Sequence, residues 1–408
     1  MSTLGRTAGL GRPVLGVFIA AAFAGLYTVV LPLLLNERGA DKPVIVAFYV
    51  LFGTVSMAVN LVVGRWCRET GRHRTGSALG AALGLVGMGL LAAPTPDWAV
   101  HVAAVCGAFG SLIYPSFVAL LDNGTLSGAR VMSLVRTVFV VGYVAGLGLA
   151  SAMFLAEETV GPLFRPIHAG LALYVCVLLL SAVLPAARRS GKSEKAGEAE
   201  PGRRAWWLVA LAVAAIFLLR GADNLRQVYL PLYALHKGMA ESVIPGLFAL
   251  TAVVEILVLV PLAAATEKFG SVRTLVAVCL VGTLSFLLVA VDTGNAGLLV
   301  AQVLYAVFTA GFQSIAVVLL GQVMRSGVSG GIGLFVAIFQ LGAVVGVAVP
   351  LVVPGYSAAI FWIGCGLCLL AATAVLTVSG ELEPRAQEES AAPPRGTAGQ
   401  AVPTEEQG

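Results

Sequence analysis

Long apolar runs recur along the whole chain, and they restrict its fold more than any other feature. Each run is about 20 residues long, the length an α-helix needs to cross the hydrocarbon core of a bilayer. Every backbone polar group inside that core must be paired within the chain, so the runs are expected to be helices. Only 11% of the residues are charged, whereas a soluble domain has about 25%. The sequence therefore predicts an all-α integral membrane protein.

Twelve spans can be counted in the 408 residues, and most loops between them are short. Short loops make successive helices antiparallel neighbours. The first apolar run lacks a small-residue cleavage site, so we expect it to remain as a helix. The expected spans are 13–35, 43–65, 75–94, 98–121, 130–155, 167–185, 206–235, 243–265, 274–291, 298–320, 330–353 and 357–378.

One polar connection divides the predicted spans into two sets of six. Residues 186–205 are charged and nearly free of large apolar side chains, which is typical of a flexible linker. We therefore expect an N-terminal six-helix bundle at 1–185, a cytoplasmic linker at 186–205 and a C-terminal six-helix bundle at 206–379. The tail at 380–408, rich in Glu, Pro, Gly and Ala, is expected to be disordered.

The positions of lysine and arginine predict the orientation in the membrane. With the N-terminus inside, 18 of the 25 basic residues lie on cytoplasmic segments, four lie on outer loops and three lie within spans. Cytoplasmic loops of membrane proteins carry this excess, so both termini are expected to be cytoplasmic, in the inner (plasma) membrane. The net charge of +4 is small and lies in loops, which argues against nucleic-acid binding.

The two predicted halves resemble each other in sequence. A Leu-Pro-Leu triplet near the end of the first span recurs in the seventh, and in each half its proline stands 39 residues before a loop glycine. A Gly-x-x-x-Gly pair in the fifth span recurs in the eleventh. Chance similarity between glycine-rich helices is the alternative. The repeated positions are Pro32 and Gly71 with Pro231 and Gly270, and Gly142 and Gly146 with Gly342 and Gly346. This arrangement of two parallel six-helix repeats resembles the architecture of the major facilitator superfamily (MFS).

The loop between the second and third spans resembles the signature of that superfamily, a glycine, an acid and then arginines around a second glycine. The expected acid position holds Arg68 with Glu69 beside it, whereas Glu267 occupies it in the second half. The resemblance implies that these charges pair across helix ends on the cytoplasmic side and hold an outward-facing state. Ordinary positive-inside charge is the alternative. The implied gating residues are Gly64, Arg68, Glu69, Gly71, Arg72, Glu267, Gly270 and Arg273.

A cluster of charged and amide side chains interrupts the seventh span. Arg220, Asp223, Asn224 and Gln227 share one helix face by their spacing, and Arg226 points about 60° off it. Charge inside a membrane is costly, so this face should meet a bundle interior or a wet cavity.

The seventh and eighth spans also resemble the sugar efflux transporter family. The residues that carry this resemblance are Gly221-Ala222-Asp223-Asn224-Leu225, Leu230-Pro231-Leu232-Tyr233, and Glu255 placed fifteen residues before Gly270, with Tyr114-Pro115 and Ser133–Arg136 in the first half. The resemblance implies proton-driven export of sugars, glycosides or sugar-like molecules. The chain departs from the family at Gln340, where arginine is expected, and at Leu147, where proline is expected.

Glu255 and Arg220 lie at similar depth in neighbouring predicted helices. Each stands about 18–22 Å from the outer end of its helix, so Glu255 and Arg220 could pair directly or through a water molecule. We predict that Glu255 binds the coupling proton, with Asp223 as the second candidate and Arg220 as the mobile partner that shifts the carboxyl pKa. A static ion pair that fixes helix packing is the alternative.

Amides and phenols suit polyol ligands because they donate and accept hydrogen bonds without charge. Arg136 is expected either to bind substrate or to form a tether with Asp122. The predicted substrate-binding residues are Asn224, Gln227, Arg136, Tyr114, Asn60, Gln313, Gln340 and Tyr27, and Tyr143, Tyr229 and Tyr305 are further candidates.

The sequence contains no GxxxxGK[ST] motif, so we expect transport driven by a gradient and not by ATP. We expect no enzymatic activity, cofactor or metal, and a monomer whose partners are a small-molecule substrate, protons and lipid. A multidrug or natural-product exporter for apolar cations is the main alternative. An uptake symporter and a non-transporting sensor or scaffold are two others.

Overall fold

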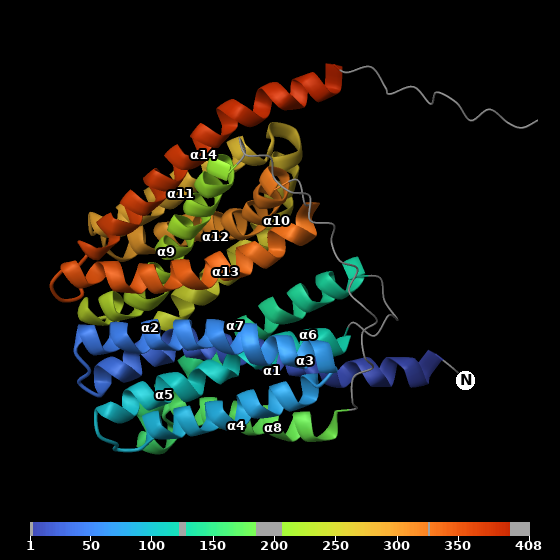
Figure 1. Cartoon of the computed structure of the whole chain (residues 1–408). Helices are drawn as coiled ribbons and strands as arrows, with labels where there is room; N and C mark the ends of the chain where they lie inside the picture. Colours follow the sequence, from blue (N-terminus) through green and yellow to red (C-terminus); the bar gives the residue numbers. More distant parts are fainter. Residues whose placement is uncertain (1–2, 122–127, 185–205, 325–326, 392–408) are drawn as a thin grey trace, which may run out of the picture.

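The computed structural model of the chain describes residues 3–121, 128–184, 206–324 and 327–391, and every element in these ranges is a helix. The predicted linker at 186–205 lies outside them. The elements (Figure 1) are α1 (Thr3–Glu37), α2 (Lys42–Val59), η1 (Asn60–Gly64), α3 (Arg65–Thr70), α4 (His73–Ala92), α5 (Trp98–Ala108), η2 (Phe109–Leu112), α6 (Ile113–Leu121), α7 (Gly128–Val160), η3 (Pro162–Phe164), α8 (Pro166–Val183), α9 (Trp206–His236), α10 (Ile244–Phe269), α11 (Ser271–Ala290), α12 (Gly294–Met324), α13 (Gly327–Ala348), η4 (Val349–Val352) and α14 (Ile360–Ala391).

The predicted spans coincide with these helices. Eleven helical segments of the described chain are long and apolar enough to cross a membrane, and the apolar segment Ile338–Val352 of α13 and η4 is shorter. The second span consists of α2, η1 and α3, and the fourth of α5, η2 and α6. One boundary was wrong, because α14 continues to Ala391 and so includes the first part of the tail that we expected to be disordered.

The helices form two bundles, α1–α8 and α9–α14. In Figure 1 the first bundle lies in the lower half and the second in the upper half. The bundles repeat the same close helix contact. A Cβ atom at Gly142 or Gly146 of α7 would collide with the backbone of α1 at Phe18 or Ala22. In the second bundle, a Cβ atom at Gly342 or Gly346 of α13 would meet the backbone of α9 at Phe217 or Gly221. The repeated glycine pair therefore lets two helices of each bundle approach at the same place.

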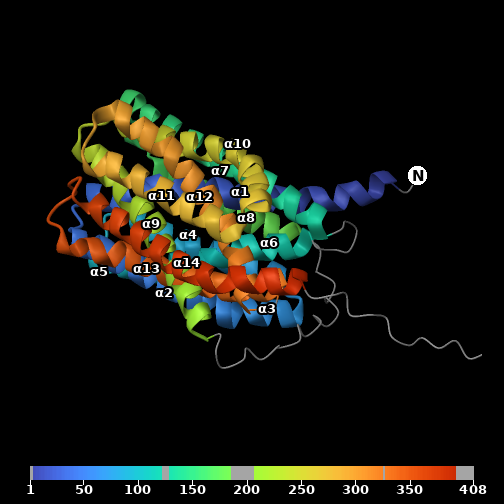
Figure 2. The same ribbon diagram turned by 90° about the horizontal axis from the view of Figure 1, so that it is seen from above.

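The bundles meet along three helix pairs, α1 with α9, α2 with α13 and α7 with α10. We call the end that carries the turns at 38–41 and 237–243 the closed face, because hydrogen bonds join the two bundles there. Lys42 donates to the carbonyls of Val353 and Gly355, and Ser151 donates to the carbonyl of Ser242. Toward the opposite end, which we call the open face, the bundles diverge (right side of Figure 1). The view from above in Figure 2 shows α1 reaching beyond both bundles on that side.

Two helix irregularities in the first bundle pack against each other. The π-turn η1 and the 3₁₀ turn η2 are joined by Asn60, whose amide donates to Ser111 Oγ at 2.8 Å and to the Ser56 carbonyl at 2.9 Å. Such turns leave backbone groups displaced from the regular helical ladder. Asn60, which the sequence suggested as a substrate ligand, therefore ties two helices of one bundle together in this state.

Candidate functional site

A cavity of about 190 Å³ lies between the two bundles, next to the polar stretch of α9. The first bundle contributes residues of α1 and α2, and the second contributes residues of α9 and α13. Its lining consists of Tyr27, Thr28, Tyr49, Phe52, Gly53, Arg220, Asn224, Gln227, Val228, Gln340, Ala343 and Val344.

The cavity has one aromatic wall and one polar wall. The aromatic wall belongs to the first bundle, where the ring centroids of Tyr27 and Phe52 lie 5.8 Å apart and Tyr49 completes the surface. The polar wall belongs to the second bundle and includes the amides of Asn224 and Gln227. The structure thus places four predicted ligands at one cavity, Tyr27, Asn224, Gln227 and Gln340. Tyr49 and Phe52 were missed, although their spacing of three on one helix was a usable signal.

Arg220 does not pair with Glu255, so that expectation was wrong. Its guanidinium forms an ion pair with Asp223, one helical turn away on α9, and lies over the Phe339 ring with 3.8 Å to the centroid. Its Nε also donates to the Phe339 carbonyl at 3.3 Å. Arg220 thus pairs with Asp223 on its own helix face, and not with Glu255 on the neighbouring helix.

Asp223 is fully buried behind the polar wall. Its carboxylate accepts hydrogen bonds from Arg220, from the Gln227 amide at 3.3 Å and from the hydroxyl of Tyr305 on α12. Three donors satisfy the hydrogen-bonding capacity of this buried carboxylate, and leaving it without partners would be costly. Asp223 is therefore held in place by its neighbours and does not line the cavity.

Arg226 is fully buried inside the second bundle, an arrangement that the sequence did not reveal. It donates to Ser285 Oγ at 2.7 Å and to Gln302 Oε1 at 3.0 Å, and its guanidinium lies 4.4 Å from the Tyr305 ring centroid. Tyr305 is thus shared between Asp223 and Arg226. The cation and the carboxylate are linked through one phenol in the bundle interior.

An ion pair joins the two bundles between the first third of α7 and the middle of α10. Arg136 Nη2 on α7 lies 2.9 Å from Glu255 Oε1 on α10, and Glu255 keeps only 19% of its side-chain surface exposed. Eleven residues separate Glu255 from the start of α10 at Ile244, which corresponds to about 17 Å. The expected tether partner of Arg136, Asp122, lies outside the described residues, and Glu255 is the partner that the structure shows.

Two further predicted ligands do not line the cavity. The ring of Tyr114 packs edge-on against Phe139 with 5.2 Å between centroids, on the α6–α7 side of the first bundle. Gln313 lies half-buried on α12. Of the other phenols, Tyr143 donates to Thr28 Oγ1 at 3.4 Å and Tyr229 to the Val347 carbonyl at 2.7 Å.

The predicted gating residues stand at helix ends on the open face. Gly71 and Gly270 both have positive φ angles, +71° and +86°, which only glycine adopts readily. Glu69 pairs with Arg65 on its own helix at 2.7 Å, and Arg72 lies 5.4 Å from the Trp66 ring centroid. In this state Glu69 therefore pairs within its own helix and not across helix ends. The gating role of the eight predicted residues stays a prediction.

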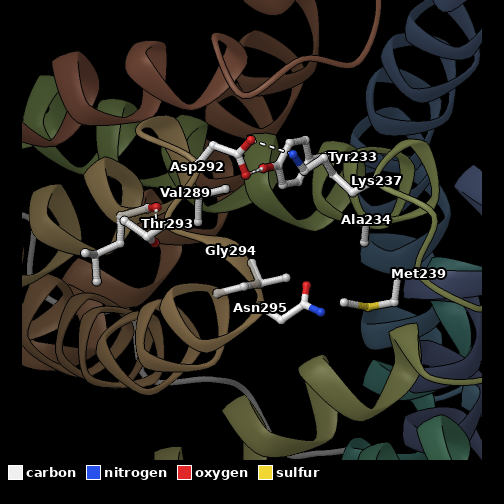
Figure 3. Close-up of a pocket in the computed structure, with 11 residues that line it drawn as sticks. Tyr233, Ala234, Lys237, Met239, Val289, Asp292, Thr293, Gly294 and Asn295 are labelled. Atoms are coloured by element: carbon white, nitrogen blue, oxygen red, sulfur yellow. Dashed lines mark hydrogen bonds and ion pairs between the residues drawn. The ribbon is translucent and has the colours of Figure 1, made fainter.

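A second, much smaller cavity of about 20 Å³ lies at the closed face of the C-terminal bundle (Figure 3). Asp292, in the α11–α12 turn, accepts hydrogen bonds there from Lys237 and from Tyr233 at 2.9 Å. The bond from Lys237, and then that from Tyr233, lowers the pKa of the Asp292 carboxyl. This cavity is too small for a substrate, and its polar groups already satisfy one another.

Carboxylates of both bundles gather at the closed face. Glu241, in the α9–α10 turn, is half-buried, and burial followed by the charges of Glu37, Glu157 and Glu158 raises its pKa above 4.5. Arg165 pairs with Glu37 at 2.6 Å and with Glu157 at 3.0 Å, which offsets part of this repulsion. Ionised Glu241 therefore opposes contact between the bundles on this face.

We predict that the closed face loosens as pH rises through the raised pKa of Glu241. Because ionisation of an acid with a raised pKa is unfavourable in the closed state, that state gains stability as pH falls. Spin labels at Thr159→Cys and Asn295→Cys, with Cys176→Ser to remove an exposed thiol, would report the distance between the bundles. Glu241→Gln should hold the short distance at neutral pH and flatten its pH dependence. An unchanged pH profile in this variant would contradict the assignment.

Comparison with known proteins decides the family. The sequence profile of the Major Facilitator Superfamily matches residues 13–291, well over half of the chain. The chain belongs to the major facilitator superfamily. No protein of curated function matches it significantly in sequence. As a member of this superfamily it is a multi-pass membrane protein and a secondary transporter of a small molecule, not an enzyme.

Solved structures of transporters share the fold. A mutant of the nucleoside transporter NupG has a TM-score of 0.75 at 14% identity, covering 90% of this chain and 98% of that one. A mutant peptide transporter POT with sulfate has a TM-score of 0.72 at 12% identity, covering 91% and 94%. A bacterial homologue of the iron transporter ferroportin, inward-facing, has a TM-score of 0.65 at 16% identity, covering 93% and 100%. Because these transporters carry different molecules, the substrate of this chain has to be inferred from the residues of its own site.

Proposed function

We propose that this transporter exports sugars, glycosides or other sugar-like small molecules by alternating access, in exchange for protons. The observation that carries the substrate class is the cavity with one aromatic and one polar wall. A pyranose ring has hydroxyl groups around its rim and apolar C–H faces, so it needs both kinds of surface. Amides of Asn224, Gln227 and Gln340 can donate to and accept from hydroxyls. Tyr27, Tyr49 and Phe52 offer rings for the apolar face.

The Arg136–Glu255 ion pair supports proton coupling. A proton on Glu255 removes the negative charge of this pair, so the ion pair between the two bundles is weakened to an ordinary hydrogen bond. Protonation and separation of α7 from α10 would thus be linked in one step. Asp223 ranks second because three donors, including Arg220, already hold its carboxylate.

The count of basic residues suggests which face is cytoplasmic. Eighteen basic residues lie on the segments expected to be cytoplasmic and four on the outer loops, which suggests that the open face is cytoplasmic. The conformation would then be inward-facing, with both termini on the cytoplasmic side of the inner membrane. The superfamily signature at the end of α3 would then stand on the open side. The Arg65–Glu69 pair within one helix fits a latch that is released in this state.

A multidrug or natural-product exporter is the competing function. The aromatic wall of Tyr27, Tyr49 and Phe52 suits apolar drugs. However, Arg220 at the same cavity is already paired with Asp223, and no carboxylate of the described chain lines the cavity to attract a cationic ligand. An uncharged, hydroxyl-rich ligand fits both walls better.

The substrate class can be tested in everted membrane vesicles with and without an imposed pH gradient. A panel of sugars, glycosides and lipophilic cationic dyes would be offered, and uptake and proton release would be recorded. Sugar-stimulated proton release supports the proposal. Release stimulated by the dyes alone would replace it with drug export, and accumulation of sugar together with protons would indicate a symporter.

Asn224 gives a sharper test of the polar wall. Its amide nitrogen is fixed by the Ala343 carbonyl at 2.7 Å, which orients the side chain at the cavity. Asn224→Ala should weaken sugar binding roughly 2- to 10-fold, the effect of one lost hydrogen bond. Gln313→Ala is the matched control, since that amide does not line the cavity. Equal sugar affinity of Asn224→Ala and wild type would remove Asn224 from the site.

A further inference from the structure

Lys42, the first residue of α2, places its ammonium group in the other bundle. Its Nζ donates to the carbonyl oxygen of Val353 at 2.6 Å and to that of Gly355 at 2.9 Å. Both carbonyls belong to the segment between α13 and α14 at the closed face. The side chain thus crosses the boundary between the bundles and ends among groups of the C-terminal bundle.

Two tyrosine rings complete the surroundings of this ammonium. Its Nζ lies 5.2 Å from the ring centroid of Tyr229 and 5.9 Å from that of Tyr356. Burial, and then the charge of Asp41, raises the pKa of Tyr356, so this phenol is neutral at physiological pH. Among the described residues, no carboxylate oxygen lies within 4 Å of Lys42 Nζ. The cation is therefore held by carbonyl dipoles and aromatic faces alone.

We define the ammonium cage as the carbonyls of Val353 and Gly355 together with the rings of Tyr229 and Tyr356. Aromatic faces and carbonyl oxygens are the groups by which proteins recognise organic ammonium ions. The Tyr356 hydroxyl is buried without a hydrogen-bond partner, so Lys42 does not satisfy every polar group beside the cage. All four cage groups lie in one bundle, whereas their occupant comes from the other.

We propose that the ammonium cage is a binding site for small primary ammonium ions, which Lys42 occupies as an internal ligand while the closed face is shut. The availability of the cage to free amines in the wild type rests on the proposed alternating access. When the bundles separate on this face, Lys42 withdraws with α2 and the cage is vacated. A free primary amine could then enter it and compete with reclosure.

The Lys42→Ala variant isolates the cage from its internal ligand. This substitution removes three methylene groups and the ammonium, which together correspond to the n-propylammonium ion. We expect n-propylammonium chloride to raise the thermal midpoint of purified Lys42→Ala by about 2 °C or more. The wild type should respond less, because its cage is already filled.

Three controls make the outcome decisive. The uncharged isostere 1-propanol should not raise the midpoint of Lys42→Ala, and sodium chloride at equal ionic strength should not either. Lys268→Ala removes an exposed lysine at the end of α10, far from the cage, and n-propylammonium should leave its midpoint unchanged. If Lys42→Ala itself fails to fold, Lys42→Ser provides the same test, because serine also leaves the cage empty. No rise in the variant, or an equal rise in wild type, in Lys268→Ala or with 1-propanol, would overturn the cage. None of these measurements uses a substrate or a pH gradient, so failure of sugar export would not affect them.

Discussion

Glu255→Gln is expected to abolish proton-driven accumulation of substrate while the protein remains folded. The amide keeps the size of the carboxyl group and can still accept a hydrogen bond from Arg136. It cannot bind and release a proton, so the link between protonation and separation of α7 from α10 is lost. Exchange of labelled for unlabelled substrate needs no net proton movement and should persist.

Proteoliposomes allow both activities of this variant to be measured. A pH gradient would drive accumulation in one assay, and counterflow without a gradient would report exchange in the other. Asp97→Asn is the matched control, since Asp97 is exposed at the start of α5 and outside the site. Undiminished pH-driven accumulation by Glu255→Gln would rule out Glu255 as the proton carrier. Loss of exchange as well would assign it to substrate binding or folding.

Gly146→Leu is expected to destabilise the first bundle severely. A Cβ atom at Gly146 would overlap the carbonyl of Ala22 in the backbone of α1, and a backbone cannot rotate away as a side chain can. Overpacking typically costs about 1–3 kcal/mol, and here two long helices would have to separate. We expect the thermal midpoint in detergent to fall on the order of 5–10 °C.

Gly148 supplies a control on the same helix. No atom lies within 4 Å of a Cβ placed there, so Gly148→Leu should leave the midpoint nearly unchanged. Gly346→Leu should reproduce the loss in the second bundle, where the corresponding contact is with Gly221. Similar midpoints for Gly146→Leu and Gly148→Leu would show that close approach of α1 and α7 is not required.

The fold was predictable because each of its causes is local in the sequence. Apolar runs define the spans, and the glycine pairs recur at matching positions in both halves, where the structure shows matching contacts. The end of α14 was missed because the chain after residue 379 is polar, and polarity alone does not distinguish helix from coil.

The site was predictable in part. The helical period placed Arg220, Asn224 and Gln227 on one face, and that face lines the cavity. The Arg136–Glu255 pair was not predictable, because the partner of Glu255 lies 119 positions away in the other bundle. Equal depth in neighbouring helices instead suggested Arg220. Arg226 was missed for a similar reason, since its partners Ser285 and Gln302 come from two other helices.

The most direct test of the account is the direction of proton movement when substrate moves. Proteoliposomes with a pH dye inside, equal pH on both sides and the membrane potential clamped at zero would receive an outward gradient of a transported sugar. Antiport predicts that sugar efflux acidifies the lumen, and that Glu255→Gln abolishes this signal. Sugar efflux that alkalinises the lumen, or that leaves its pH unchanged in the wild type, would contradict proton-coupled export.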